Sequence, residues 1–276
     1  MALRIAYVTS GMGHTGTAIC QALHQAGHRV IAGCGPRSSR KDHWLKEQKS
    51  LGYDFIASEG DATDWASTEA AFAKVRREVG EIDVLVNNAG AMLDMRFRQM
   101  SQADWSAVLR SNLDTLFNST KQVVDGMAER GWGRIINIGS VAAEKGQIGQ
   151  INYATAKGAV LGFTRSLAQE VAARGVTVNA VSPGFIANAT ISARPAQTPA
   201  CFIISPSPDR AAKACHVDYA RTTPYIATVA WNGAVRSYTG PSREGVGAGQ
   251  AQGTHDAVRS RPSGENMLGL GSLARK

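Results

Sequence analysis

The chain has 276 residues, of which 43% are hydrophobic and 19% charged, and its formal net charge is +8. This length and composition suit one α/β domain with a sizeable core, and no apolar run is long enough to span a bilayer. The charge does not indicate a nucleic-acid partner. After residue 189 there are ten Lys and Arg against five Asp and Glu, so that segment carries +5 of the +8, and no basic stripe with interleaved aromatic residues occurs.

The cysteines and the N-terminus suggest a cellular compartment. Cys20, Cys34, Cys201 and Cys215 are spaced neither as metal ligands nor as a disulfide scaffold. The first four residues run directly into a strand-like segment, so no signal peptide is predicted. We therefore expect a cytoplasmic protein without a metal site.

Apolar runs alternate with helix-like stretches over the first two thirds of the chain. Strands are predicted at residues 3–9, 29–34, 54–58, 83–86, 133–138 and 176–181. Helices are predicted at residues 15–26, 41–50, 64–79, 102–111, 113–130 and 151–173, the third capped by Thr63 or Asp64. This alternation predicts right-handed crossovers and a Rossmann-type, doubly wound parallel sheet with helices on both faces.

The composition changes after about residue 189. Seven of the nine prolines lie in residues 190–276, where Arg outnumbers Lys by eight to two, and 225–231 is the one strand-like stretch that stands out. Such a segment buries little apolar surface. We expect a nucleotide-binding and catalytic domain over residues 1–189 and a poorly ordered tail over 190–276.

A glycine-containing turn, Thr9 to Gly16, joins the first predicted strand to its helix. Small residues let the backbone approach a pyrophosphate, and the helix N-terminus attracts its charge. The predicted cofactor contacts in this turn are Gly11, Met12, Gly13 and Gly16.

The second predicted strand ends at Cys34 and Gly35 without an acidic residue for a ribose 2′-hydroxyl. Arg37, Arg40 and Lys41 follow and suit a 2′-phosphate, which favours NADPH over NADH; a solvated basic loop is the alternative. The predicted contacts after the second, third and fourth strands are Gly35, Arg40, Asp61, Ala62, Asn88, Ala89 and Gly90.

Tyr153 and Lys157 lie four residues apart on a predicted helix and therefore share a face. A cationic amine lowers the pKa of a neighbouring phenol, and the hydroxyl of Ser140 is suited to hold a carbonyl oxygen. The trio provides what carbonyl reduction needs, although a Tyr-x-x-x-Lys spacing by itself also fits two ordinary helix residues.

Together these motifs resemble the short-chain dehydrogenase/reductase family. The resemblance is carried by Asn87-Asn88-Ala89-Gly90, Asn112, Ser140, Tyr153 with Lys157, and Pro183-Gly184. Over about residues 3–188 the chain is similar to the NADPH-dependent acetoacetyl-CoA reductases of polyhydroxybutyrate synthesis, for example at 32–36, 54–60, 131–135 and 145–147.

The resemblance implies that NADPH reduces acetoacetyl-CoA to (R)-3-hydroxybutyryl-CoA. Tyr153 would be the general acid, Lys157 would lower its pKa and hold the nicotinamide ribose, and Ser140 would orient the keto oxygen. Asn112 would support a water linked to Lys157. The remaining implied contacts are Pro183 and Gly184 with the nicotinamide, and Asp94, Gln147, Gln150 and Phe185 with the acyl-CoA substrate.

The resemblance also implies a homo-oligomer, tetrameric in the family, with a dimer as the alternative for this chain. Two other functions stay open: reduction of 3-oxoacyl groups on acyl carrier protein, and a catalytically impaired, NADP-binding remnant. The relative activity with acetoacetyl-CoA and with an acyl-carrier-protein thioester distinguishes the two reductase functions. NADPH binding without ketone reduction indicates the impaired remnant.

The chain departs from the family pattern in two places. Ser10 and His14 replace glycines of the first turn, and a positive φ at either would cost on the order of 1 kcal/mol. Residues 190–276 do not resemble the family's last helices and seventh strand, which predicts an incomplete sheet edge. We interpret the abrupt change at residues 187–189 as a reading-frame shift, with a lineage-specific tail as the alternative. Coding DNA that offers no family-like frame near codon 188 would exclude the shift.

Overall fold

The computed structural model describes residues 3–184, 200–204, 226–231 and 234–237. All of these fall in one compact unit, Met1–Gly240, and a second unit, Pro241–Lys276, lies outside the described residues. Most of the predicted tail lies outside them too. The division of the chain at residue 189 and the poor order of the tail therefore stay predictions.

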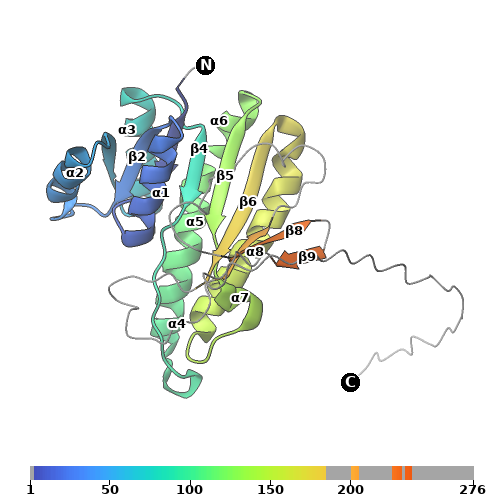
Figure 1. Ribbon diagram of the computed structural model, residues 1–276. Coiled ribbons are helices and arrows are strands. Elements are labelled where there is room, and N and C mark those ends of the chain that lie inside the picture. Colours follow the sequence, from blue (N-terminus) through green and yellow to red (C-terminus); the bar gives the residue numbers. More distant parts are fainter. Residues whose placement is uncertain (1–2, 185–199, 205–225, 232–233, 238–276) are drawn as a thin grey trace, which may run out of the picture. The chain divides into compact units, whose positions relative to one another are not determined.

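The first six strands form a parallel sheet in the order β3-β2-β1-β4-β5-β6 (Figure 1). These strands are β1 (Ile5–Val8), β2 (Arg29–Cys34), β3 (Phe55–Glu59), β4 (Val84–Asn87), β5 (Gly133–Ile138) and β6 (Val176–Pro183). All six predicted strands and the Rossmann-type fold class are confirmed. Because β1 pairs with β2 on one side and β4 on the other, the strand order reverses there, and a ligand crevice is expected at the carboxyl ends of these strands.

The sheet continues beyond β6 with three shorter strands, β7 (Ala200–Ile204), β8 (Ile226–Trp231) and β9 (Ala234–Ser237). β7 is antiparallel to β6, β8 is parallel to β7, and β9 is antiparallel to β8. β8 confirms the strand-like stretch at 225–231, whereas β7 and β9 were not predicted. As expected, no seventh parallel strand follows β6 among the described residues, but the edge of β6 is covered because β7 pairs with it.

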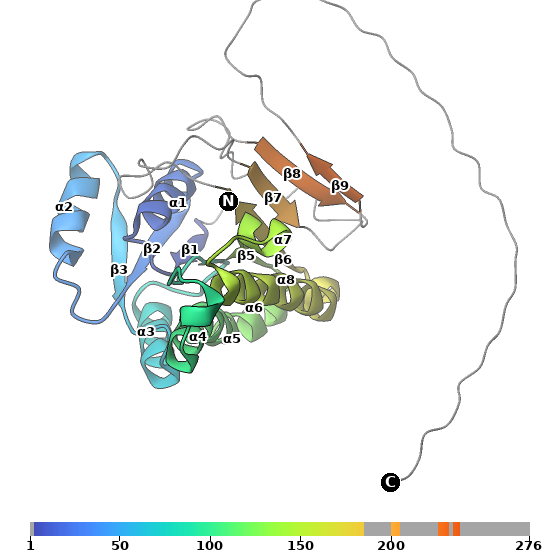
Figure 2. The same ribbon diagram turned by 90° about the horizontal axis from the view of Figure 1, so that it is seen from below.

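Helices cover both faces of the parallel sheet. Figure 2 shows α1 (His14–Gln25) and α2 (Lys41–Ser50) on one side, and α3 (Trp65–Glu78), α4 (Gln102–Leu109), α5 (Thr115–Lys121), α6 (Val124–Glu129) and α8 (Ile151–Val171) on the other. The predicted helix at 113–130 is divided into α5 and α6, and the short α7 (Val141–Lys145) was not predicted. Asp64 caps α3 by accepting a hydrogen bond from the Ser67 amide, which decides between the two predicted caps.

The core is divided between the two faces because neighbouring strand residues point to opposite sides. Tyr7, Ile31 and Leu85 pack in one buried cluster. The two sequence neighbours of each of these residues point to the other face and pack in a second cluster. These neighbours are Ala6, Val8, Val30, Ala32, Val84 and Val86. These buried strands give the loops at their carboxyl ends a rigid base. Within the described ranges, no helix is long and apolar enough to cross a membrane.

Candidate active site

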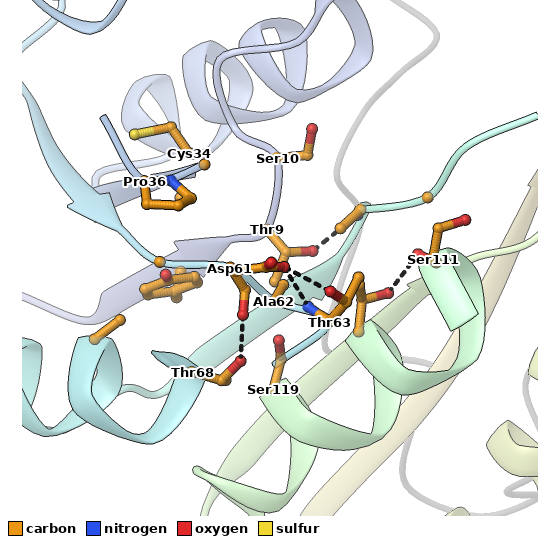
Figure 3. A pocket seen from close by; sticks show the side chains of 18 of the residues that line it. Thr9, Ser10, Cys34, Pro36, Asp61, Ala62, Thr63, Thr68, Ser111 and Ser119 are labelled. Atoms are coloured by element: carbon orange, nitrogen blue, oxygen red, sulfur yellow. Dashed lines mark hydrogen bonds between the residues drawn. The ribbon is translucent and has the colours of Figure 1, made fainter. Parts of the chain in front are cut away.

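A cleft of about 390 Å³ lies at the carboxyl ends of β1, β2, β3 and β4 (Figure 3). Five predicted cofactor residues line it: Gly35, Asp61, Ala62, Ala89 and Gly90. Lining residues that the sequence did not assign to the cofactor site include Pro36, Thr63, Ser111, Thr115 and Ser119. The last three lie in the segment between α4 and α6. This segment packs on β4, and that packing brings the three side chains to the cleft.

The two residues that replace glycines in the turn after β1 differ in backbone conformation. Ser10 takes the left-handed conformation with φ of 50°, so the strain expected for one of the two replacements is present. His14 is the first residue of α1, is exposed and has no positive φ, so the expectation of strain applies to Ser10 alone. A Cβ on Gly11 would lie 2.8 Å from the Ala32 Cα, and one on Gly16 would lie 2.8 Å from the Gly11 Cα. Only glycine fits at these two positions.

Asn88 and Thr9 tie the loop after β4 to this turn. The Thr9 hydroxyl accepts hydrogen bonds from the backbone amides of Asn88 and Ala89, both at 2.9 Å. The Asn88 side chain donates to the carbonyl oxygens of Thr9 at 3.0 Å and Ser10 at 3.2 Å. Asn88 therefore fixes the floor of the cleft and does not line it.

The basic residues after β2 differ in their surroundings. Arg40 immediately precedes α2, is exposed, and pairs with no carboxylate among the described residues. Lys41 forms a 2.7 Å ion pair with Glu59. Arg37 is exposed and has φ of 55°. The remaining turn residues, Met12 and Gly13, are half-buried and lie outside the cleft.

These residues fit a dinucleotide. Apart from Tyr7 and Phe72, most of the residues that line the cleft are small. The 12-residue helix α1 begins beside it without an acidic residue in its first turn, so its unpaired N–H groups suit a phosphate. Close packing at Gly11 and Gly16 brings that helix end against the turn.

Tyr153 and Lys157 lie on the first turns of α8. The Lys157 ammonium is 5.6 Å from the centroid of the Tyr153 ring and donates a 2.8 Å hydrogen bond to the carbonyl oxygen of Ile138. The side chain is 4% exposed, and this burial lowers the pKa of Lys157 to about 8.

Burial raises the pKa of Tyr153, the nearby charge of Asp94 adds to this, and a hydrogen bond with Ser140 opposes it. The direction is opposite to the one predicted from the Tyr-x-x-x-Lys spacing, because loss of solvent outweighs the other influences. In this structure the phenol is therefore a protonated group at neutral pH.

Ser140 stands between β5 and α7. Its hydroxyl accepts a 3.2 Å hydrogen bond from the Ala142 amide and thereby caps α7. The five-residue helix is too short for an apolar periodicity, which is why the sequence pattern did not reveal it. A serine followed by Val141-Ala142-Ala143-Glu144 was the available signal.

Asn112 lies in a π-helical turn, Arg110–Asp114, which joins α4 to α5. Its amide donates to the carbonyl oxygens of Ala91 at 2.8 Å and Val108 at 2.9 Å. Its side-chain oxygen is buried and has no partner among the described residues. A Cβ on Gly90 would collide with this oxygen and would lie 3.5 Å from the Lys157 ammonium, so Gly90, Asn112 and Lys157 meet at one point.

Two predicted substrate residues contact each other. The Gln150 amide, 6% exposed, donates a 2.9 Å hydrogen bond to the carboxylate of Asp94. The neighbouring backbone is tied as well, since Met95 donates to the Gly149 carbonyl and Asn152 donates to the Leu93 carbonyl. Gln147 is half-buried beside them.

The end of β6 supplies the last predicted residues. Pro183 ends the strand and Gly184 follows it, but neither lines the cleft. Phe185 lies outside the described residues.

Asn87 belongs to a buried hydrogen-bond network that the sequence motif did not predict. It is buried, and its amide donates to the Thr120 hydroxyl and to the Asn137 side-chain oxygen, both at 2.9 Å. Asn137 in turn donates to the Thr164 hydroxyl at 2.9 Å. This series, which we call the amide ladder, links β4 and β5 to α5 and α8.

Residues 4–198 match the family model described as short chain dehydrogenase, and the chain belongs to this family. It is 63% identical over 193 residues to the acetoacetyl-CoA reductase of Cupriavidus necator, covering 70% of this chain and 78% of the relative. It is 39% identical over 188 residues to a 3-oxoacyl-(acyl-carrier-protein) reductase of Vibrio cholerae, covering 66% and 73%.

A solved structure with the same fold is a gluconate 5-dehydrogenase from Burkholderia cenocepacia in complex with NADP and tartrate. The two chains superpose with a TM-score of 0.64 at 30% identity, covering 70% of this chain and 75% of the other.

Proposed function

We propose that the protein reduces acetoacetyl-CoA to (R)-3-hydroxybutyryl-CoA with NADPH. One observation carries the proposal: Ser140, Tyr153, Lys157 and Asn112 converge next to a cleft whose residues fit a dinucleotide. The 63% identity to an acetoacetyl-CoA reductase supports this substrate over an acyl-carrier-protein thioester, for which the relative named above is 39% identical.

NADPH, when bound, supplies the hydride that reaches the keto carbon. The proposed contacts that line the cleft are Gly35, Asp61, Ala62, Ala89 and Gly90. The proposed contacts around it are Gly11, Met12, Gly13, Gly16, Arg40, Asn88, Pro183 and Gly184. Gly11 and Gly16 would let the turn approach the pyrophosphate, and Arg40 would contact the 2′-phosphate. Asp61 and Ala62 would border the adenine.

Tyr153 delivers the proton. Because burial raises its pKa, the phenol is protonated at neutral pH and donates to the oxygen on which negative charge develops. Ser140, already hydrogen-bonded with Tyr153, orients the same oxygen. The two hydroxyls therefore hold the same oxygen of the ketone.

Lys157 and Asn112 restore the proton. The Lys157 ammonium lies near the ring of Tyr153, where its charge stabilises the phenolate left after donation. Its pKa of about 8 allows it to lose and regain a proton near neutral pH. The unpaired oxygen of Asn112 lies at the same point and would hold a water that connects Lys157 to solvent.

The acyl-CoA would lie along the tied segments at 91–95 and 147–150. Asp94, Gln147, Gln150 and Phe185 are the proposed contacts. Met92 and Ile148, 55% and 89% exposed, add apolar surface for the thioester arm. We also expect a cytoplasmic protein that forms a homo-oligomer. Light scattering on the purified protein tests the oligomeric state.

The decisive experiment follows NADPH absorbance with acetoacetyl-CoA, for the parent and for Tyr153→Phe. We expect turnover in the parent and a loss of ~10³-fold in kcat in the variant, because the proton donor is removed, with NADPH affinity unchanged. An acyl-carrier-protein thioester run beside acetoacetyl-CoA tests the substrate. A higher kcat/KM for the carrier-protein substrate would favour that reaction, and NADPH binding without any ketone reduction would indicate a catalytically impaired remnant.

A further inference from the structure

An ion pair beside the cleft joins Lys41, one of the basic residues after β2, to Glu59, for which the sequence predicted no role. Lys41, the first residue of α2, places its ammonium 2.7 Å from a carboxylate oxygen of Glu59, the last residue of β3. The two side chains are 30% and 39% exposed. A pair of this exposure contributes little to stability, so its position is more informative than its strength.

The pair lies beside the wall of the cleft formed by Cys34, Gly35 and Pro36. Glu59 is the register partner of Cys34 in the pairing of β2 with β3, and the residues that follow Glu59 also line the cleft. Burial raises the pKa of the Cys34 thiol, Glu59 raises it further, and Lys41 lowers it. Both charges therefore act at this wall.

The end of β2 is where a doubly wound sheet distinguishes NADH from NADPH. A carboxylate there suits a ribose 2′-hydroxyl, whereas a cation suits a 2′-phosphate. In this chain β2 itself ends without an acid, but the adjacent strand brings Glu59 to the same edge. An unpaired Glu59 would repel a 2′-phosphate, and a Glu59 neutralised by Lys41 does not.

We propose that the Lys41–Glu59 ion pair sets the preference for NADPH. Lys41 cancels the charge of Glu59 and keeps N–H donors that would be available to the 2′-phosphate of a bound NADPH, as would the neighbouring Arg40. Glu59 in turn limits how strongly the cation attracts that phosphate. The inference rests on the use of NADPH in the proposed function and deepens it by naming two specificity residues.

Calorimetric titration of the full chain with 2′,5′-ADP and with 5′-AMP tests the pair, because the two probes differ by the 2′-phosphate. Lys41→Met should weaken 2′,5′-ADP binding by ~10-fold and change 5′-AMP binding by less than about twofold. Glu59→Gln should strengthen 2′,5′-ADP binding by about threefold, and the double variant should return to within about twofold of the parent. Lys121→Met is the matched control, since it breaks the 2.8 Å pair between Lys121 and Asp125, neither of which lines the cleft, and it should change neither affinity.

Two results would overturn the proposal and leave the pair with a structural role between α2 and β3. One is that Lys41→Met weakens the binding of both probes equally, and the other is that Glu59→Gln weakens the binding of 2′,5′-ADP. If Lys41→Met does not fold, the change in 2′,5′-ADP affinity of Glu59→Gln decides: a gain supports the proposal and a loss overturns it. A parent that binds neither probe overturns this inference together with the use of NADPH. A parent that discriminates as expected but leaves acetoacetyl-CoA unreduced overturns the proposed substrate and supports the role of the pair.

Discussion

The turn after β1 and the cluster at the start of α8 lie at the same edge of the sheet and are held in different ways. Backbone groups build the turn: the Gly11 amide donates to the Gly33 carbonyl, and the Ser10 carbonyl accepts from Gly13 and Asn88. Side chains build the cluster, where Lys157 and Asn112 are buried and hydrogen-bonded to carbonyl oxygens. A backbone-built turn accepts a serine in place of glycine at the cost of strain, whereas the cluster depends on the identity of each residue.

The largest effects are expected in the cluster. Lys157→Met should lower kcat by ~10³-fold, since proton return and phenolate stabilisation are lost. It should also raise the free energy of unfolding at pH 7 by about 1–2 kcal/mol, because the fold buries an ammonium whose pKa falls from 10.5 to about 8 and the unpaired Ile138 carbonyl offsets part of the gain.

Urea unfolding at pH 7 and pH 9.5 checks the second effect. Between pH 8 and 10.5 the unfolded parent binds more protons than the folded one, so the parent gains stability as the pH rises and the advantage of the variant shrinks. A variant that is less stable than the parent at pH 7 would contradict this account.

A single methyl group tests how tightly the cluster is packed. In Gly90→Ala the new Cβ collides with the Asn112 oxygen, so we expect kcat to fall by ~10–100-fold through displacement of Asn112. Gly162→Ala in the interior of α8 is the control: it meets nothing within 4 Å and should raise stability by about 0.5–1 kcal/mol. Equal kcat in the two variants would show that Asn112 has no part in the reaction.

The pH dependence of reduction sharpens the assignment of Lys157. The value of kcat/KM for NADPH should fall as the pH rises through about 8, by about tenfold per unit above it, because the ammonium loses its proton. Tyr153 should not titrate in this range, since its pKa is raised above 10.0. Initial rates from pH 6 to 9.5 measure the profile, and a flat profile to pH 9.5 would remove Lys157 from the proton path.

The smallest effect is expected in the turn. Ser10→Gly removes a side chain from a left-handed residue and should raise the free energy of unfolding by about 1 kcal/mol. NADPH should bind a few-fold more tightly, as fluorescence titration would show. Ser10→Ala keeps the Cβ and serves as the control; an equal gain there would assign the effect to the hydroxyl and not to φ.

The sequence predicted the parallel sheet well because buried strands and helices of ordinary length leave clear patterns. β2 and α2 were predicted at their observed bounds, and the main misses, α7, β7 and β9, are short elements without their own periodicity. The site residues were predicted from motifs. What the motifs could not supply were the outcomes of tertiary contact: the raised pKa of Tyr153, the bond between Asp94 and Gln150, and the pairing of Lys41 with Glu59.

The amide ladder has a consequence for how the chain finds its strand register during folding. Asn87 and Asn137 are direct partners in the pairing of β4 with β5, and both lie among apolar residues. A slip by one residue in either direction would separate the two carboxamides and set at least one of them against an aliphatic residue, Ile136 or Ile138 opposite Asn87, at a cost of about 1–3 kcal/mol for each carboxamide left unpaired in the core. If β4 and β5 carried only aliphatic side chains, the correct register and the shifted registers would differ little in free energy. The two asparagines therefore favour one alignment of β4 with β5 over its one-residue shifts.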